Sequence, residues 1–169
     1  MTVGRWLLML LAVITAAPLL AQQDAGQLLS PGEVERIRTE KKAWIALNMD
    51  LASEEGERFW PIYENYQKEL GQINLRLIKL IEEYGTHYRN NTLTDPIARK
   101  LTEESLAIDE AELKLRRNYF IRLSKALPAR KVARYLQLEG RVHTQVRYEL
   151  AANLPLAGDV KPDIPRTPK

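Results

Sequence analysis

A chain of 169 residues with a formal net charge of +3 is long enough for one domain with a sizeable hydrophobic core. It contains no cysteine, which excludes disulfides, thiolate metal sites and a lipid-anchored cysteine. Glycine is scarce, at eight residues, while 28% of the residues are charged. This composition favours an all-α fold and argues against a glycine-rich phosphate-binding loop.

The amino terminus has the pattern of a cleavable secretory signal peptide over residues 1–21. Arg5 supplies a short positive region, and an apolar run follows over residues 6–17. Ala21 is the small residue that signal peptidase requires before the cut. The alternative interpretation is an uncleaved anchor, which the apolar run disfavours because a membrane span needs roughly twenty apolar residues. We expect export to the periplasm, cleavage after Ala21 and a linker over residues 22–29.

The first expected helix begins at a capping box and runs to about Met49. Ser30 and Glu33 have the S-x-x-E spacing, in which each side chain bonds a backbone N–H at the helix start, and Pro31 takes the first helical position. An apolar stripe follows, formed by Val34, Ile37, Trp44 and Leu47. Lys41 interrupts this stripe and indicates a partly exposed face.

The second expected helix contains the most regular pattern in the chain. Ser53 can cap its start, where Glu55 would complement the helix dipole. Apolar residues then alternate steps of four and three, which is the pattern of a seam for a partner helix. The seam consists of Phe59, Tyr63, Tyr66, Leu70, Ile73, Leu77, Leu80 and Tyr84. Pro61 should kink the helix unless it lies in the unpaired first turn. We expect Gly85 to end the helix and residues 86–93 to form a polar loop.

The third expected helix starts at Thr94 to Pro96 and ends at Leu127, because Pro128 biases the residue before it out of the helical region. One apolar face contains Ile97, Leu101, Ile108, Leu115, Tyr119 and Leu123. A second set widens the apolar stripe to more than half the circumference: Leu106, Leu113 and Phe120. A helix with so wide an apolar face should contact two neighbours, one of which could belong to a second subunit.

The fourth expected helix runs from Pro128 to about Asn153. Its apolar positions are Val132, Tyr135, Leu136, Val142, Val146 and Leu150. Residues 154–169 contain four of the nine prolines and are expected to form a disordered tail. Residues 30–153 should therefore form a helical domain with four long helices in a hairpin or bundle arrangement.

Charge is distributed unevenly along the chain. Residues 33–112 contain 17 acidic and 11 basic residues, whereas residues 114–147 contain ten basic residues and one acidic residue, Glu139. Eight of the ten are the predicted partner-binding residues, called the basic surface below: Arg116, Arg117, Arg122, Lys125, Arg130, Lys131, Arg134 and Arg141. The other two are Lys114 and Arg147.

A basic cluster of this kind would indicate nucleic-acid binding in a cytoplasmic protein. An exported protein does not meet nucleic acid, so we expect acidic protein surfaces as partners, with anionic lipid headgroups as a second, peripheral contact. The alternative is a solvated face that acidic residues of the other helices neutralise.

Two helix starts share a pattern at a constant offset of 76 residues. The matching residues are Leu51, Glu55, Arg58 and Phe59 in the first start and Leu127, Lys131, Arg134 and Tyr135 in the second. A general similarity of helix starts is the alternative explanation. A leucine followed by a capping residue, with a polar residue four positions on, is how the paired L-T-x-x-Q motifs of the Spy/CpxP family are built. The segments FWPIYENYQKEL (59–70) and LPARKVARYLQLEGR (127–141) resemble helix openings of divergent periplasmic members of that family.

The resemblance extends over residues 34–150. The sequence departs from the family pattern at Ala52 and Pro128, where threonine is expected, and at Glu55 and Lys131, where glutamine is expected. The resemblance implies a homodimer, formed through long antiparallel helices into a curved cradle. It also implies a nonenzymatic function, either ATP-independent shielding of unfolded clients or binding of an envelope-stress sensor. The competing hypothesis is a regulatory partner of one membrane-bound sensor or anti-sigma system, without general chaperone activity.

Patterns typical of catalysis or metal binding are weak in this chain. The chain has only two histidines, His87 in the expected loop and His143, and no cysteine, which disfavours a metal-responsive protein, and we expect no cofactor. Adjacent carboxylates point about 100° apart on a helix, and the serines lack a nucleophile elbow. The aromatic residues Phe59, Trp60 and Tyr63 could form a ligand platform, but the seam register favours burial of all except Trp60.

Overall fold

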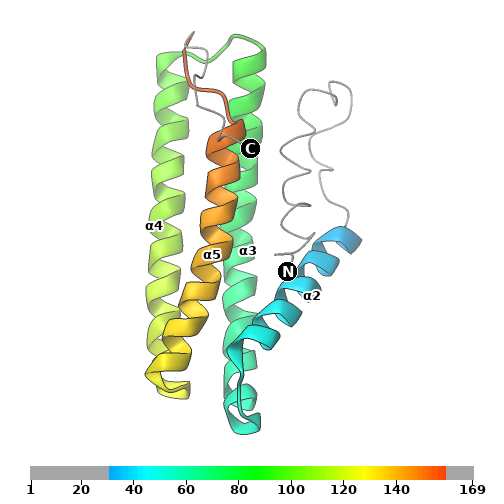
Figure 1. Cartoon of the computed structure of the whole chain (residues 1–169). Helices are drawn as coiled ribbons and strands as arrows, with labels where there is room; N and C mark the ends of the chain where they lie inside the picture. Colours follow the sequence, from blue (N-terminus) through cyan, green and yellow to red (C-terminus); the bar gives the residue numbers. More distant parts are fainter. Residues whose placement is uncertain (1–30, 159–169) are drawn as a thin grey trace, which may run out of the picture. The chain divides into compact units, whose positions relative to one another are not determined.

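The computed structural model describes residues 31–158, and every regular element in that range is an α-helix. The helices are α2 (Pro31–Met49), α3 (Ser53–Arg89), α4 (Asp95–Ala126) and α5 (Ala129–Asn153) (Figure 1). The expected all-α class is confirmed for this range. The predicted signal peptide, the linker and residues 159–169 of the predicted tail lie outside the described residues.

The chain divides into two compact units. Within the described residues, one unit contains α2 and the part of α5 from Ala133 onward. The other unit contains α3, α4 and the first residues of α5, through Val132. Each unit has interhelical contacts of its own.

The start of α3 differs from the expected capping. The N-cap is Ala52, and Ser53 is already helical. Alanine has no side-chain acceptor, so only one half of a capping box forms: the Glu55 carboxylate accepts the N–H of Ala52 at 3.0 Å. Pro61 lies beyond the first turn, and α3 continues through it. The carbonyl oxygen of Pro61, which faces the next turn, accepts the side-chain amide of Asn65 at 2.9 Å.

The end of α3 lies beyond the glycine that was expected to stop it. The helix continues through Gly85 to Arg89. The residue with left-handed backbone is Asn91, at φ 53°, and asparagine tolerates this conformation better than most residues. The N–H of Thr92 bonds the carbonyl oxygen of His87 at 2.9 Å, which closes a short loop. His87 therefore lies in the last turn of α3 and not in a loop.

The boundaries of α4 follow its local sequence signals. Thr94 is the N-cap and Pro96 lies in the first turn. Leu127 is the C-cap with an extended backbone, and its N–H bonds the carbonyl oxygen of Leu123 at 2.9 Å. Pro128 excludes the helical conformation at Leu127, which explains why α4 stops there.

The start of α5 falls one residue later than expected, at Ala129. Pro128 lies outside the helix and acts as its cap. Its carbonyl oxygen accepts the N–H groups of Lys131 and Val132 at 2.9 and 3.1 Å. α5 thus begins with backbone capping alone.

α3 and α4 form an antiparallel hairpin, and Figure 1 shows them running side by side from the connecting loop. Three side-chain contacts join them, at 2.6, 3.0 and 2.8 Å: Glu69 with Tyr119, Arg76 with Glu104, and Glu83 with Lys100. Later residues of α3 meet earlier residues of α4, which is the order of an antiparallel pair.

The hairpin core combines the α3 seam with one face of α4. The first three seam residues, Phe59, Tyr63 and Tyr66, are at most 2% exposed, whereas Trp60 is partly exposed. The rings of Tyr66 and Tyr119 meet edge to face at 5.2 Å. The other buried apolar residues of α4 are Leu101, Ile108, Leu115 and Leu123. The later seam residues are only partly buried: Leu70, Ile73, Leu77, Leu80 and Tyr84.

The buried face of α2 matches the predicted stripe only in part, because Ile37 and Trp44 are partly buried. Leu47 is 84% exposed, while Ile45 and Met49 are fully buried. Lys41, Ile45 and Met49 are four residues apart and share one side of the helix. Lys41 was expected to mark an exposed face, but it lies 2.8 Å from the carboxylate of Glu139 on α5. Pairing of its charge allows the lysine to lie on the buried side.

The apolar face of α5 is narrower than the sequence indicated. Val132 and Tyr135 are 1% exposed and Leu150 is 7% exposed. Three further members of the predicted stripe are only partly buried: Leu136, Val142 and Val146. Leu138, which the predicted stripe omitted, is 5% exposed.

Candidate protein-binding surface

The chain contains no acidic residue between Glu112 and Glu139. Both bounding carboxylates are buried, with residue exposures of 9% and 4%. Glu112 pairs with Arg116 at 3.2 Å, and Glu139 pairs with Lys41 at 2.8 Å. Because each carboxylate is buried and paired, neither places negative charge on the exposed surface of the segment between them.

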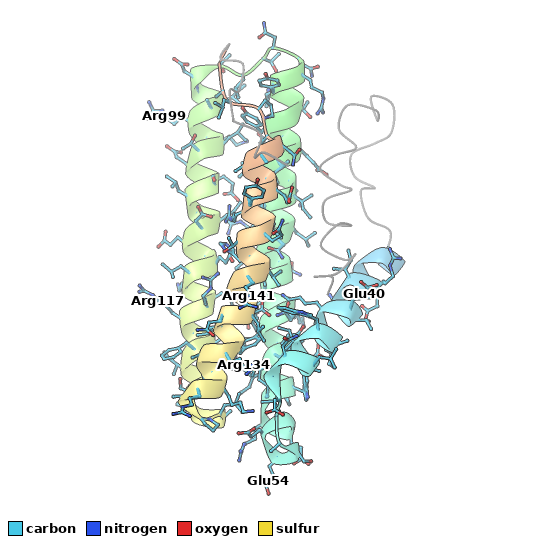
Figure 2. All side chains as sticks on the ribbon, viewed as in Figure 1. Glu40, Glu54, Arg99, Arg117, Arg134 and Arg141 are labelled. Carbon is cyan, nitrogen blue, oxygen red and sulfur yellow. The ribbon has the colours of Figure 1, made fainter. Side chains whose placement is uncertain are left out.

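Six residues of the basic surface lie in the unit that contains α3 and α4. Arg117, Arg122, Lys125 and Arg130 are exposed, while Arg116 and Lys131 are partly buried. Figure 2 shows Arg117 projecting from α4 away from α3. The guanidinium of Arg122 lies 4.7 Å from the centroid of the Tyr119 ring, a cation–π contact.

The remaining two residues of the basic surface, Arg134 and Arg141, lie on α5 in the other unit (Figure 2). Arg141 is exposed. The Nε of Arg134 donates to the carbonyl oxygen of Asn48 at the end of α2. A cation at a helix carboxyl terminus satisfies carbonyl groups that lack helical partners, so Arg134 has a structural contact as well as a charge.

The alternative for this surface was that acidic residues of other helices neutralise its charge. Arg116 does form an ion pair, but with Glu112 of its own helix. Within residues 31–158, no ion pair involves Arg117, Lys125, Arg130 or Arg141. Half of the basic surface thus has its charge exposed to solvent without a fixed counter-charge among the described residues.

An exposed apolar residue lies among these cations. Ile121 is 55% exposed. Lys114, Arg117, Ile121 and Lys125 are spaced by three or four residues, so they lie along one side of α4. Ile121 is not among the residues that the sequence pattern indicated, although its position beside the buried stripe was the available signal. Cations around an apolar side chain suit a polypeptide with acidic and apolar residues.

The two predicted motif starts place an aromatic residue in equivalent positions. Phe59 and Tyr135, each eight residues after the motif leucine, are 0% and 1% exposed. Of the leucines, Leu127 is 6% exposed and Leu51 is partly buried. The shared feature is thus a buried aromatic residue in the second turn after the helix start.

The polar position of the motif is used differently at the two starts. The Glu55 carboxylate caps the backbone of α3, as described above. The ammonium group of Lys131 contains no acceptor atom and so cannot cap a backbone N–H. The backbone N–H of Lys131 bonds the carbonyl oxygen of Pro128. The lysine side chain thereby adds to the basic surface and takes no capping role.

Tyr119 fixes the basic half of α4 against α3. Its hydroxyl donates to Glu69 at 2.6 Å. Burial, together with this hydrogen bond to a carboxylate, raises the pKa of Tyr119 to about 12, while the nearby Arg122 acts in the opposite direction. Further along the hairpin, the hydrogen bond from Arg76 lowers the pKa of Glu104.

Other kinds of site have no support in the described range. Residues 31–158 contain no group of three or more His, Cys, Asp or Glu side chains placed to hold a metal ion. None of the described helices is long and apolar enough to cross a membrane. Comparisons with family models, with curated proteins and with solved structures found no match for this chain.

Proposed function

We propose that this protein is an exported, nonenzymatic, homodimeric protein of the Spy/CpxP type that binds unfolded or acidic envelope proteins without ATP. The observation that carries the proposal is the segment between Glu112 and Glu139, which has no acidic residue of its own. Its bounding carboxylates are buried and paired, while Arg117, Lys125 and Arg130 are exposed.

Long-range attraction and weak local contact together suit transient binding. Exposed cations draw in an acidic chain over roughly a Debye length, about 10 Å at 0.1 M salt. Contacts at an exposed surface each contribute little, so a bound chain can move and exchange. Ile121 adds an apolar contact beside Lys125.

The test is aggregation of an unrelated, acidic, chemically unfolded protein, followed by light scattering with and without residues 22–169 of this chain. We expect suppression at about 20 mM salt without nucleotide, and much weaker suppression at about 500 mM salt, where the Debye length falls to a few Å. No suppression at either salt concentration would contradict the proposal. That result, combined with capture of one membrane-bound sensor from envelope extract, would favour the regulatory hypothesis instead.

A further inference from the structure

Two tyrosines in the last turns of α3 form an aromatic pair beside the loop to α4. The rings of Tyr84 and Tyr88 are stacked, with centroids 6.1 Å apart and an angle of 25° between the ring planes. Tyr84 is partly buried, whereas Tyr88 is 42% exposed. The pair therefore has an inner ring that the fold holds in place and an outer ring that solvent reaches.

Gly85, which lies between the two tyrosines in the sequence, leaves space for a charged side chain. A Cβ at this position would lie only 3.1 Å from a guanidinium nitrogen of Arg89. Glycine in a helix interior is unfavourable relative to alanine, but here it allows the guanidinium to approach the helix backbone. The end of α3 thus combines aromatic ring faces with the O–H and N–H donors of Tyr88 and Arg89.

Prolines recur at every third position in residues 159–169, which follow the described part of the chain. They are Pro162, Pro165 and Pro168. Proline fixes its own φ and biases the residue before it towards an extended backbone. Both effects favour polyproline II, a helix with three residues per turn and no internal hydrogen bonds. In that conformation the three prolines share one side of the segment.

This proline-rich segment starts near the tyrosine pair. Ala157 and Gly158, the last described residues, belong to the same compact unit as α3 and α4. Figure 1 shows the end of the described chain, in red, by the loop that joins α3 to α4. From Gly158, a polyproline II segment extends about 12 Å to Pro162 and about 31 Å to Pro168, at 3.1 Å per residue.

We propose that residues 159–169 dock on Tyr84 and Tyr88 in the polyproline II conformation, so that the end of α3 is a proline-rich peptide site occupied by the chain's own tail. Aromatic side chains bind polyproline II segments because proline rings pack on them and the preformed segment loses little entropy. The carbonyl groups of the tail accept hydrogen bonds from the Tyr88 hydroxyl and the Arg89 guanidinium. Neither tyrosine belongs to the basic surface, so this site does not depend on the proposed function.

Tethering favours the tail over an unattached ligand. A short connection gives the tail an effective concentration on the order of 1 mM. One aromatic pair buries little area, so we expect a dissociation constant on the order of 100 μM for a free peptide. The tail should then occupy the site about nine-tenths of the time, and an added peptide should bind the unchanged chain about tenfold more weakly than a chain with an empty site.

Paramagnetic broadening in the full chain tests the docking, because a single cysteine can be introduced into a chain that has none. A nitroxide at Thr167→Cys lies between two prolines of the repeat. We expect it to broaden the amide signals of residues 84–92 and to leave residues 53–60, at the other end of α3, unchanged. The matched control replaces all three prolines, Pro162→Gly, Pro165→Gly and Pro168→Gly, and is called the glycine-tail variant. In this variant the broadening of residues 84–92 should fall about fivefold, because the tail is no longer docked most of the time.

A labelled peptide with the sequence of residues 159–169 tests the site by fluorescence anisotropy. It should bind the glycine-tail variant about tenfold more tightly than the unchanged chain, whose own tail competes. Adding Tyr88→Ala to the glycine-tail variant should weaken binding roughly tenfold, the loss expected for one aromatic contact. Tyr148→Ala, at a tyrosine of α5 that is 58% exposed, is the control and should leave binding unchanged. Circular dichroism checks that the helices persist in each variant.

Three results would overturn the proposal. The first is equal broadening of residues 84–92 with the proline tail and the glycine tail. The second is peptide binding that Tyr88→Ala does not weaken. The third is broadening that appears only when isotope-labelled chains without a nitroxide are mixed with nitroxide-labelled chains, which would show that the tail of a second copy occupies the pair.

Discussion

The ammonium group of Lys41 on α2 lies 2.8 Å from the carboxylate of Glu139 on α5, and the two side chains are only 12% and 5% exposed. Removing one partner leaves a buried charge unpaired. We expect Glu139→Leu to lower the free energy of unfolding by about 3 to 5 kcal/mol, and the double variant Lys41→Met, Glu139→Leu to recover most of that loss. Urea unfolding of the single and the double variant measures both changes in the free energy of unfolding.

A surface ion pair provides the control for that experiment. Arg38 and Glu35 on α2 are 3.2 Å apart, but their side chains are 53% and 65% exposed. Arg38→Ala should change the free energy of unfolding by less than about 0.5 kcal/mol. If the double variant of the buried pair is as unstable as the single variant, the loss comes from packing and not from the unpaired charge.

The hydrogen bond from Tyr119 to Glu69 predicts a loss of stability at alkaline pH. The pKa of Tyr119 is raised from 10.0 to about 12 in the folded protein. The unfolded chain therefore releases this proton first, so the stabilisation is complete below pH 10 and is lost as the pH rises towards 12. The raised pKa of Tyr84 adds to the same trend.

The variant Tyr119→Phe should reduce this alkaline loss, which is about 2 kcal/mol for a shift of this size. At pH 7 it should cost about 1 kcal/mol, from the lost hydrogen bond. Tyr148→Phe, at an exposed position (58%), is the control and should leave the pH profile unchanged. Unfolding measured between pH 7 and 11.5 compares the three proteins, and an unchanged profile in Tyr119→Phe would contradict the assignment.

The side chains of the α3 seam differ in burial, and the stability lost when each is truncated should differ in the same order. Phe59 is 0% exposed, whereas Leu77 is only partly buried. We expect Phe59→Ala to cost about 3 to 5 kcal/mol and Leu77→Ala to cost less than about 2 kcal/mol. Guanidinium unfolding monitored by circular dichroism measures both values. Equal costs at low protein concentration would mean that Leu77 is more deeply buried than the structure shows.

Local signals in the sequence predicted local structure well. Thr94 with Pro96 marked the start of α4, and Pro128 marked its end, because capping and proline sterics act within a few residues. Gly85 was a wrong stop signal, since glycine is tolerated within a helix and Asn91 supplied the left-handed residue instead.

Contacts between distant residues were not predictable in the same way. The buried face of α2 follows Lys41, whose partner Glu139 is 98 residues away in the sequence. Nothing in the local pattern reveals that Glu139 is buried and paired. The burial of Glu112, in contrast, was indicated by the sequence, because Glu112 lies four residues after Ile108 and three before Leu115, on the core side of α4. The exposed charge of the basic surface depends on both of these buried acids, so it became visible only in the structure.

Reversing charge on the basic surface should weaken client protection. We expect Lys125→Glu, Arg130→Glu to reduce suppression of aggregation about five- to tenfold at low salt, because two exposed cations become anions that repel an acidic client. The matched control Lys79→Glu, Arg89→Glu alters two exposed basic residues of α3 by the same net charge. Equal loss in both variants would indicate an effect of total charge.

The central claim, binding of acidic unfolded polypeptides by the basic surface, is tested most directly by fluorescence anisotropy with two labelled, disordered polypeptides. One has Glu and Asp interspersed with apolar residues, and the other has Lys and Arg at the same positions. We predict that the acidic polypeptide binds at least tenfold more tightly at about 20 mM salt, and that the difference shrinks at about 500 mM salt. Equal affinity for the two polypeptides, or binding of neither, would contradict the account.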